Sequence, residues 1–493
     1  MKKEINPPVF YTSAGLIILF VLLGIFFTEW FEEAVTILND TITTYFGWYL
    51  TLTVSLFVIF SLFLMFGRYK NTRLGPDYSK PEYSFFAWMA MLFSCGMGIG
   101  LLFYGVAEPM LHYATPPIGE AGTVEAAKTA MHFSFLHWGI HAWATYIIVG
   151  LSLAYFSFRK GFPLSLRYVF YPIFGERIHG RIGHLIEICA VLGTLFGVAT
   201  SLGIGSMQIN SGLTYLFGIP NNITVKIILI TIITAMAMTS VISGINKGIK
   251  WLSVFNVSAG TLLLLFVIAF GPTLFIIKTF IQYLGSFMQN VIEISFWNDA
   301  FSDSGWQNAW TLFYWSWWIA WSPYVGMFIA RISKGRTISE FIFGVLFIPT
   351  LISMLFLTAF GGTGIFLHRQ GATSIMAAVE ENVSTALFEF FRHFPMTSLI
   401  SGIGVISVIT FFVTSSDSGS LVIDIITSGG NTNPPLATRI FWSILEGTVA
   451  ATLLLGGGLI ALQTAALSMA LPFSFFLLLM CFCLYKSLKE ETG

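Results

Sequence analysis

Hydrophobic and polar positions alternate along this chain in long blocks. Apolar runs of about 20 residues, the length at which an α-helix crosses the hydrocarbon core of a bilayer, recur throughout the sequence. Polar and charged residues gather in the short segments between these runs. The pattern predicts an all-α polytopic membrane protein without a soluble domain of useful size. We place its twelve transmembrane helices at residues 9–28, 47–67, 85–112, 129–158, 184–217, 223–245, 251–277, 308–330, 341–367, 396–426, 439–462 and 465–485.

The composition supports a membrane protein and excludes several other classes. Of the 493 residues, 56% are hydrophobic and 10% are charged, whereas ordinary soluble domains carry roughly 25% charged residues. The 24 basic residues balance the 24 acidic ones, so a nucleic-acid partner is not expected. Glu108 and Asp417 are the notable acids within apolar runs. No nucleophile and base are spaced to work with them, so we do not expect an enzyme.

The basic residues indicate how the helices are oriented. If the N-terminus is cytoplasmic, the inner segments hold 19 of the 24 Lys and Arg residues and the outer segments hold 5. Cytoplasmic loops of membrane proteins are enriched in Lys and Arg, so we predict that both termini are cytoplasmic. Residues 486–493 follow the last span. We expect them to form a short cytoplasmic tail, which is either natural or the result of truncation.

Two outer segments have amphipathic patterns. Residues 28–45 mix three glutamates with Trp30, Phe31 and other apolar side chains. In residues 273–297, apolar side chains recur at near-helical spacing, at Ile276, Phe280, Tyr283, Phe287 and Val291. We interpret the second segment as a helix that lies along the outer surface.

The third span carries an unusual run of glycines. Gly96, Gly98 and Gly100 recur at every second position, and each glycine costs a helix about 1 kcal/mol relative to alanine. Close helix packing is the alternative explanation, but it favours small residues at a spacing of four. We predict an unwound stretch near the middle of the membrane, where free carbonyls can coordinate a cation and free amides can hold an anionic group. We expect a second interruption at residues 321–323, because Pro323 cannot donate a hydrogen bond to the preceding turn.

The tenth span contains a polar patch around Asp417. Six residues of the patch carry hydroxyls, namely Thr410, Thr414, Ser415, Ser416, Ser418 and Ser420. An acid within a membrane span is costly and is a candidate functional residue, and hydroxyl oxygens suit a hard monovalent cation such as Na⁺. Alternatively, Thr414 and Ser415 bond back to carbonyls of their own helix. The patch alone does not decide between these two interpretations.

A cluster of aromatic residues marks the eighth span. Trp317, Trp318 and Trp321 are spaced three and four residues from one another, so they share one helix face. Aromatic rings attract poorly hydrated quaternary ammonium ions, with about 0.5–2 kcal/mol per ring. We predict that these three residues form a quaternary ammonium cage with Trp315 in support, and we assign Trp306 and Trp310 to the membrane interface, where Trp is common.

The fourth span adds aromatic and histidine side chains. At 100° per residue, Trp138, Trp143 and Tyr146 would spread over a broad arc of one helix, so some of them could face neighbouring helices instead of substrate. His137 and His141, together with His132, lie in the same span. We interpret the three histidines as structural residues and not as metal ligands.

These segments together resemble one family over essentially the whole chain. The resemblance rests on Gly96–Gly105 with Glu108-Pro109, on His137-Trp138 with Trp143 and Tyr146, and on Trp315–Pro323 leading into Ala330–Arg336. On these motifs the chain is similar to the betaine/choline/carnitine transporter (BCCT) family, and its two ends look most like the choline-transporter branch. The resemblance implies a homotrimer in a bacterial inner membrane, surrounded by lipid, that works by alternating access.

The family resemblance also implies a division of the chain. Two extra N-terminal helices (1–84) precede a LeuT-like core of two inverted five-helix repeats. The first repeat (85–280) contains spans three to seven, and the second (308–485) contains spans eight to twelve. An outer surface helix and loop (281–307) lies between them, and the short tail (486–493) ends the chain.

The resemblance assigns roles to individual residues. Its implied substrate cage comprises Trp138, Trp143, Tyr146, Trp317, Trp318 and Trp321, with Met97, Gly98 and Gly100 beside it. Its implied Na⁺ site comprises carbonyls at Ser94, Met97 and Phe411 and hydroxyls of Thr414 and Ser415. A second Na⁺ site of the family is only partly matched. Thr194 provides its hydroxyl, but Val198 has none and Tyr324 replaces the usual Phe.

Our leading hypothesis is Na⁺-coupled import of choline or glycine betaine, with no cofactor besides the coupling ion. Proton-coupled choline members of the family carry an Asp where this chain has Gly100. The alternatives are a proton-coupled choline symporter and a sodium-independent exchanger for carnitine or betaine. An ion channel is a different class and is less favoured, because the chain has interrupted helices and one compact aromatic cluster.

Overall fold

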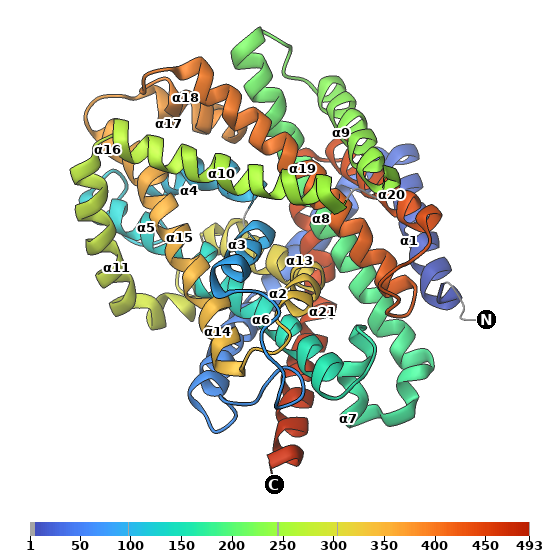
Figure 1. The fold of residues 1–493 in the computed structure, drawn as a ribbon. Coiled ribbons are helices and arrows are strands. Elements are labelled where there is room, and N and C mark those ends of the chain that lie inside the picture. Colours follow the sequence, from blue (N-terminus) through green and yellow to red (C-terminus); the bar gives the residue numbers. More distant parts are fainter. Residues whose placement is uncertain (1–4, 97, 244–245, 303, 493) are drawn as a thin grey trace.

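The computed structural model describes residues 5–96, 98–243, 246–302 and 304–492, and these residues form a helical bundle without a β-strand (Figure 1). The first half of the chain contains α1 (Pro7–Phe26), α2 (Thr28–Phe66), α3 (Phe85–Gly96), α4 (Ile99–Ala114), α5 (Val124–Trp138), α6 (Ile140–Ala154), α7 (Tyr171–Phe174), α8 (Arg181–Phe217), α9 (Ile223–Ser243) and α10 (Asn246–Phe270). The second half contains α11 (Thr273–Ser295), α12 (Trp306–Ala309), α13 (Thr311–Ile332), α14 (Ile338–Leu346), α15 (Ile348–Leu357), α16 (Thr363–Arg369), α17 (Ser374–Glu381), α18 (Ala386–Phe391), α19 (Thr397–Thr427), α20 (Leu436–Leu455) and α21 (Gly458–Thr492).

Ten helical segments in the described part of the chain are long and apolar enough to cross a membrane. They coincide with ten of the twelve predicted spans, and the chain is therefore a multi-pass membrane protein. The remaining two predicted spans have special features. Residues 85–112 are divided between α3 and α4. Residues 308–330 fall mostly in α13, which is rich in Trp and Ser and is less hydrophobic than the ten.

The predicted interruption of the third span is present. Helix α3 ends at Gly96, α4 begins at Ile99, and Gly98 between them has the non-helical dihedral angles φ −142° and ψ −114°. Met97, which we assigned to both the substrate and the Na⁺ site, lies outside the described residues. A Cβ atom on Gly98 would come within 2.9 Å of the Phe411 ring. The glycine thus allows the broken backbone to approach α19 closely.

The predicted interruption of the eighth span is wrong. Helix α13 continues through Pro323 to Ile332. A proline removes the N–H that would bond to the carbonyl four residues earlier, which here belongs to Ile319. The Ser322 hydroxyl donates to that carbonyl at 2.8 Å. Because this side chain satisfies the freed carbonyl, the helix passes through the proline without a break.

The boundaries of three other predicted segments also differ. The amphipathic segment 28–45 and the second span form the single 39-residue helix α2, because no proline or glycine precedes Gly47 within it. The fourth span is divided at Gly139 into α5 and α6. A Cβ atom at Gly139 would lie 2.4 Å from the Phe135 carbonyl oxygen, so the bend accommodates only glycine. Trp138 and Trp143 therefore do not share one regular helix, as their predicted arc assumed.

Helix α13 lies near the centre of the bundle, where it packs against α6, α8 and α21 (Figure 1). Glycines bring the backbones together at these crossings. A Cβ atom on Gly326 of α13 would lie 3.0 Å from the backbone nitrogen of Gly150 in α6, and one on Gly197 of α8 would lie 3.1 Å from the Trp321 nitrogen. In contrast, α11 lies at the periphery and buries one face, which includes Ile276 and Phe287. The segment is helical as predicted, and its place on the outer membrane surface stays a prediction.

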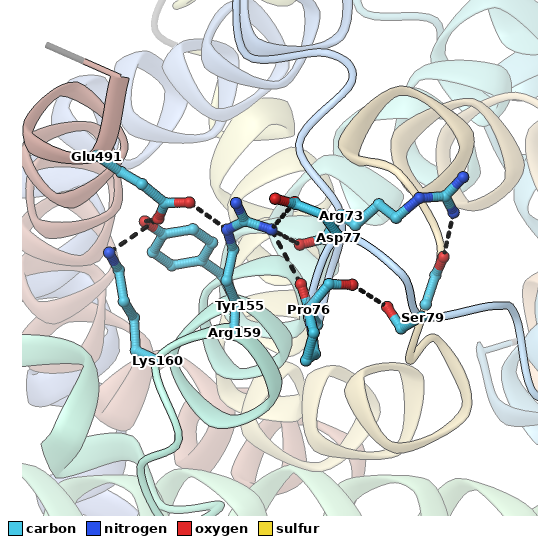
Figure 2. Close-up of polar contacts among 10 residues, drawn as sticks. Arg73, Pro76, Asp77, Ser79, Tyr155, Arg159, Lys160 and Glu491 are labelled. Atoms are coloured by element: carbon cyan, nitrogen blue, oxygen red, sulfur yellow. Dashed lines mark hydrogen bonds and ion pairs between the residues drawn. The ribbon is translucent and has the colours of Figure 1, made fainter.

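A polar network fastens the C-terminal end of α21 to the rest of the bundle (Figure 2). Glu491 accepts hydrogen bonds from Arg159 and from the Tyr155 hydroxyl, the latter at 2.7 Å, and pairs with Lys160 at 2.8 Å. Arg159 also donates to Asp77 at 2.8 Å. The predicted tail is thus a continuation of α21 up to Thr492 and not a separate segment. Its last turn is held against the end of α6 and the connection between α2 and α3.

Candidate functional site: an aromatic cavity beside a broken helix

The centre of the bundle contains a small cavity between α4, α5, α8, α13 and α19. The cavity volume available to water-sized groups is about 30 Å³, which is enough for one or two water molecules. No charged side chain is found among the described residues around it. The cavity is lined by Gly98, Ile99, Gly100, Trp138, Ser201, Trp317, Trp318, Trp321, Phe411 and Ser415.

Four indole rings form most of the wall. Trp317 and Trp318 stack with ring centroids 4.9 Å apart and an interplanar angle of 12°. Trp138 meets Trp318 edge to face at 5.1 Å. Rings at a centroid distance of 4.9 Å leave no room for an ion between them. A cation must therefore lie against their outer faces, or the rings must separate to admit it.

Gly100 shapes this wall from the start of α4. A Cβ atom at this position would lie 2.7 Å from the Cη2 atoms of both Trp138 and Trp317. The absent side chain allows the two ring edges to converge over the backbone. The amide groups in the first turn of α4 have no carbonyl four residues earlier in a regular helix, and they lie beside the aromatic wall.

Two of the predicted cage residues stand behind the wall. Neither Trp143 nor Tyr146 is among the residues that line the cavity, although both are buried. Tyr146 meets Trp318 at 6.2 Å, and Trp143 meets Tyr146 at 5.6 Å. Through these contacts they support a ring of the wall.

The other tryptophans of this region are packed inside the protein. Trp315 stacks on His141 at 5.2 Å, which agrees with a supporting role. The assignment of Trp306 to the membrane interface is wrong, because it is buried and lies 4.7 Å from the His112 ring. Trp310 is half-buried and also contacts His112, at 4.6 Å.

The structure brings together only part of the proposed Na⁺ site. Phe411 and Ser415 border the cavity. The Thr414 hydroxyl instead donates to the Thr410 and Phe411 carbonyls of its own helix, each at 3.0 Å, which is the alternative that the sequence left open. Ser94 lies in the last turn of α3. A coordinating role for Thr414 would require its side chain to rotate away from these carbonyls.

Asn256 of α10 is a site residue that the sequence analysis missed. Its amide nitrogen donates to the Thr414 hydroxyl at 3.2 Å, and its amide oxygen accepts from Thr410. A second small cavity borders Asn256, Gly98 and Phe411, so this amide lies next to the broken helix. The available signal was an amide side chain in a span whose other polar residues carry only hydroxyls.

Asp417 has a partner that the sequence did not predict. It pairs with Arg439 of α20 and accepts a hydrogen bond from Ser240 at 3.0 Å. A buried charge is tolerated when it is paired and hydrogen-bonded. The pair joins α19 to α20 and α9, and Asp417 is not among the residues that line the aromatic cavity.

Thr194 and Tyr324, which we assigned to a second ion site, lie on the facing helices α8 and α13. Thr194 is fully buried, and its hydroxyl oxygen has no hydrogen-bond partner in the described part of the chain. Tyr324 is buried and meets Trp321 at 5.2 Å. Val198 is one turn from Thr194 and contributes no oxygen.

A buried carboxylate lies behind the aromatic wall. Glu108 of α4 receives hydrogen bonds from His137 at 2.7 Å, from His112 at 3.2 Å and from Trp138 at 2.6 Å, and also from the Tyr314 hydroxyl. The ligand atoms of Glu108, His112 and His137 lie within 4.8 Å of one another, as in a metal site. The hydrogen bonds engage both carboxylate oxygens, and the structural role of His137 stays a prediction.

Comparison with known proteins places the chain in a family. The family model described as "BCCT, betaine/carnitine/choline family transporter" matches residues 8–493. The glycine betaine transporter OpuD of Bacillus subtilis is 45% identical over 100% of this chain and 96% of its own length. The glycine betaine transporter of Acinetobacter baylyi is 44% identical over 99% of this chain and 74% of its own length. The high-affinity choline transport protein of Escherichia coli is 41% identical over 99% and 73%, respectively.

The match across nearly the whole chain, and identities of 41–45% to relatives that the chain covers over 73–96% of their length, agree with the resemblance seen in the motifs. Members of this family are transporters and not enzymes. The chain belongs to the betaine/carnitine/choline (BCCT) family of transporters.

Proposed function

We propose that this protein imports glycine betaine, choline or both across a bacterial cell membrane by alternating access, coupled to Na⁺. The observation that carries the proposal is the uncharged cavity walled by four indole rings. A quaternary ammonium ion has no N–H to donate and is poorly hydrated, so ring faces are suitable partners for it. The relatives named for glycine betaine and for choline transport agree with this class of substrate.

The broken helix favours glycine betaine as the first substrate to test. The first turn of α4 borders the cavity at Gly98, Ile99 and Gly100. Free amides and the positive end of the helix dipole attract an anionic group, which betaine has and choline lacks. Choline is the second candidate. A proton-coupled choline symporter and a sodium-independent exchanger for carnitine or betaine are the alternatives, and an ion channel is the candidate from a different class.

For Na⁺, we propose a site at the contact between the broken helix and α19. Its ligands would be the carbonyls of Ser94, Met97 and Phe411 with the hydroxyls of Thr414 and Ser415. Hydroxyl and carbonyl oxygens are suited to a hard cation, and the Thr414 hydroxyl would become available after rotation. A second Na⁺ site at Thr194 and Tyr324 would be incomplete, because Val198 stands at the position of its second hydroxyl and has none.

The proposed transport cycle needs an architecture with two related halves. We propose that the family's LeuT-like core is formed by residues 85–280 and 308–485, preceded by the two N-terminal helices in 1–84. Residues 281–307 would form the outer surface helix and loop, and residues 486–493 would lie in the cytoplasm with the N-terminus. We further propose a homotrimer surrounded by membrane lipid.

Uptake by purified protein in proteoliposomes tests the proposal. Radiolabelled betaine, choline and carnitine are each offered with an inward Na⁺ gradient and with K⁺ in place of Na⁺. We expect concentrative, saturable betaine uptake that requires Na⁺. Uptake that is unchanged in K⁺ would overturn the coupling, and counterflow without a gradient would favour the exchanger.

Binding measurements on tryptophan variants test the cage separately. Trp318→Ala should weaken betaine binding by about 2–30-fold, the range that corresponds to one lost ring. Trp442→Ala is the matched control, because this buried indole of α20 packs against Phe10, away from the residues that line the cavity. Equal affinities in the Trp318 variant and the wild type would show that the cage is assigned wrongly.

A further inference from the structure

We propose that Glu108 positions and polarises the aromatic wall, and thereby sets the preference of the site for a cationic headgroup over an uncharged group of the same shape. The inference rests on the proposed function, because it concerns the same cavity. Glu108 does not line the cavity itself, so its action would be transmitted through the rings that do.

The hydrogen bonds of Glu108 reach two parts of the wall directly or through one neighbour. One carboxylate oxygen accepts from Trp138, which lines the cavity, and from the Tyr314 hydroxyl. The Tyr314 ring packs against Trp138 at 5.4 Å and against Trp318 at 5.8 Å. The other oxygen accepts from His137, whose backbone carbonyl accepts the indole N–H of Trp318 at 2.8 Å. One carboxylate thus fixes the orientation of two cavity indoles.

The donor pattern indicates that Glu108 carries a negative charge. Indole N–H groups can only donate, and an ionised carboxylate can only accept, so both oxygens of the ionised form match the donors around them. The group is completely buried. Burial of a carboxylate is costly unless it is well hydrogen-bonded, and hydrogen bonds to a charged acceptor are about twice as strong as neutral ones.

The two imidazoles do not cancel this charge. The second nitrogen of His137 lies 3.0 Å from the Thr311 hydroxyl, which can donate to it. The second nitrogen of His112, Nδ1, is buried without a hydrogen-bond partner in the described part of the chain. A charged His112 would leave a buried N–H unsatisfied, whereas a neutral His112 donates to Glu108 through Nε2 alone. The arrangement therefore fits a neutral His112 beside an anionic Glu108.

A charge at this place has a specific consequence for recognition. Withdrawal of the Trp138 indole proton toward a carboxylate increases electron density on the ring, and a more negative ring face attracts a cation more strongly. The anion also attracts a cationic ligand directly across the ring. Neither effect acts on an uncharged tert-butyl group, which contacts the same ring surface by dispersion and the hydrophobic effect alone.

Isosteric ligands separate this electrostatic role from a merely structural one. Glycine betaine is compared with 3,3-dimethylbutanoate, and choline with 3,3-dimethylbutan-1-ol, in which carbon replaces the ammonium nitrogen. Dissociation or inhibition constants are measured on purified full-length protein. In Glu108→Gln, the preference for the cation over its isostere should fall about tenfold, with the isostere constants changed by much less. Glu108→Asp, which keeps the charge, should restore part of the preference.

Two further variants, which both keep the carboxylate charge, keep the test available if Glu108→Gln does not fold. Tyr314→Phe removes one donor to Glu108 without leaving a new buried donor, and should change the preference only slightly. Likewise, His112→Phe removes a donor but keeps the carboxylate charge, so the preference for the cation should be retained. The proposal would be overturned if Glu108→Gln weakened the binding of the cation and of its isostere by the same factor. It would also be overturned if the single variant His112→Phe lost the preference for the cation. Wild-type protein that binds neither betaine nor choline would instead refute the proposed function.

Discussion

Substitution of Gly100 by alanine tests whether the convergence of the tryptophan rings determines substrate affinity. The added Cβ atom would lie 2.7 Å from the ring tips of Trp138 and Trp317. Because non-bonded carbon atoms prefer separations of about 3.5–4.0 Å, each ring would have to retreat by roughly 0.8 Å. Both residues are fixed by neighbouring rings, so this retreat disturbs the stack of Trp317 on Trp318.

The expected effects on binding and on folding are of similar size, so both are measured. Overpacking of a core costs about 1–3 kcal/mol, and replacement of a helical glycine by alanine returns up to about 1 kcal/mol. We therefore expect stability to decrease by about 0–3 kcal/mol. Displacement of one ring from its contact with the ammonium group should weaken betaine binding by about 2–30-fold.

The assay is betaine titration of purified protein by tryptophan fluorescence, together with thermal unfolding of the same samples. Gly402→Ala is the matched control, since this glycine lies in the long helix α19 and a Cβ atom there would meet no other atom within 4 Å. We expect the control to bind like the wild type. If folded Gly100→Ala protein binds betaine with wild-type affinity, the convergence of the two rings over Gly100 does not determine recognition.

Three further predictions concern other parts of the structure. Thr414→Ala should raise the Na⁺ concentration for half-maximal uptake by about tenfold, the equivalent of about 1.4 kcal/mol for one lost ligand. Thr414→Ser should stay close to the wild type. Equal Na⁺ dependence in all three proteins would exclude the hydroxyl as a ligand. Arg159→Ala should lower stability by about 1 kcal/mol, a usual value for a partly exposed ion pair. The effect should be smaller when Glu491 is already replaced by Gln, although Arg159 then keeps its pair with Asp77. Additive losses in the double variant would show that Arg159 and Glu491 are not coupled. Ser322→Ala should lower the free energy of unfolding by about 1 kcal/mol, because the carbonyl that accepts from this hydroxyl loses its partner. The control is Ser316→Ala, which should be nearly neutral because the Ser316 hydroxyl has no partner in the described residues. Equal effects of the two variants on thermal unfolding would contradict this role of the Ser322 hydroxyl.

The sequence predicted the wall of the cavity better than the ion site. Trp317, Trp318 and Trp321 share a helix face by their spacing alone, and all three line the cavity. The Thr414 hydroxyl is different, because a threonine in a helix can bond to its own backbone or turn outward, and its environment determines which. In this structure it bonds to its own backbone. Asn256 beside it comes from a helix more than 150 positions away, so the spacing of residues could not reveal the contact.

Breaks in helices were only partly predictable. The glycine run at residues 96–100 weakened the helix locally enough to interrupt it. Pro323 did not, because the neighbouring Ser322 satisfies the carbonyl that the proline leaves free. Gly139 did divide its helix, although it is a single glycine in an apolar run. A single glycine or proline lowers the stability of a helix by only a few kcal/mol, and tertiary contacts of similar size decide whether the helix breaks.

By itself, the sequence determined that this protein is a multi-pass helical membrane protein and that its family is that of quaternary ammonium transporters. The first conclusion follows from apolar runs that match the bilayer thickness, and the second follows from the resemblance of several local motifs to those of the family. Only the tertiary structure decided that Trp143 and Tyr146 stand behind the cavity, that Asp417 is paired with Arg439, and that Glu108 accepts a hydrogen bond from Trp138. These outcomes depend on contacts between distant helices, and the direction of a side chain across such a contact is set by how the helices cross.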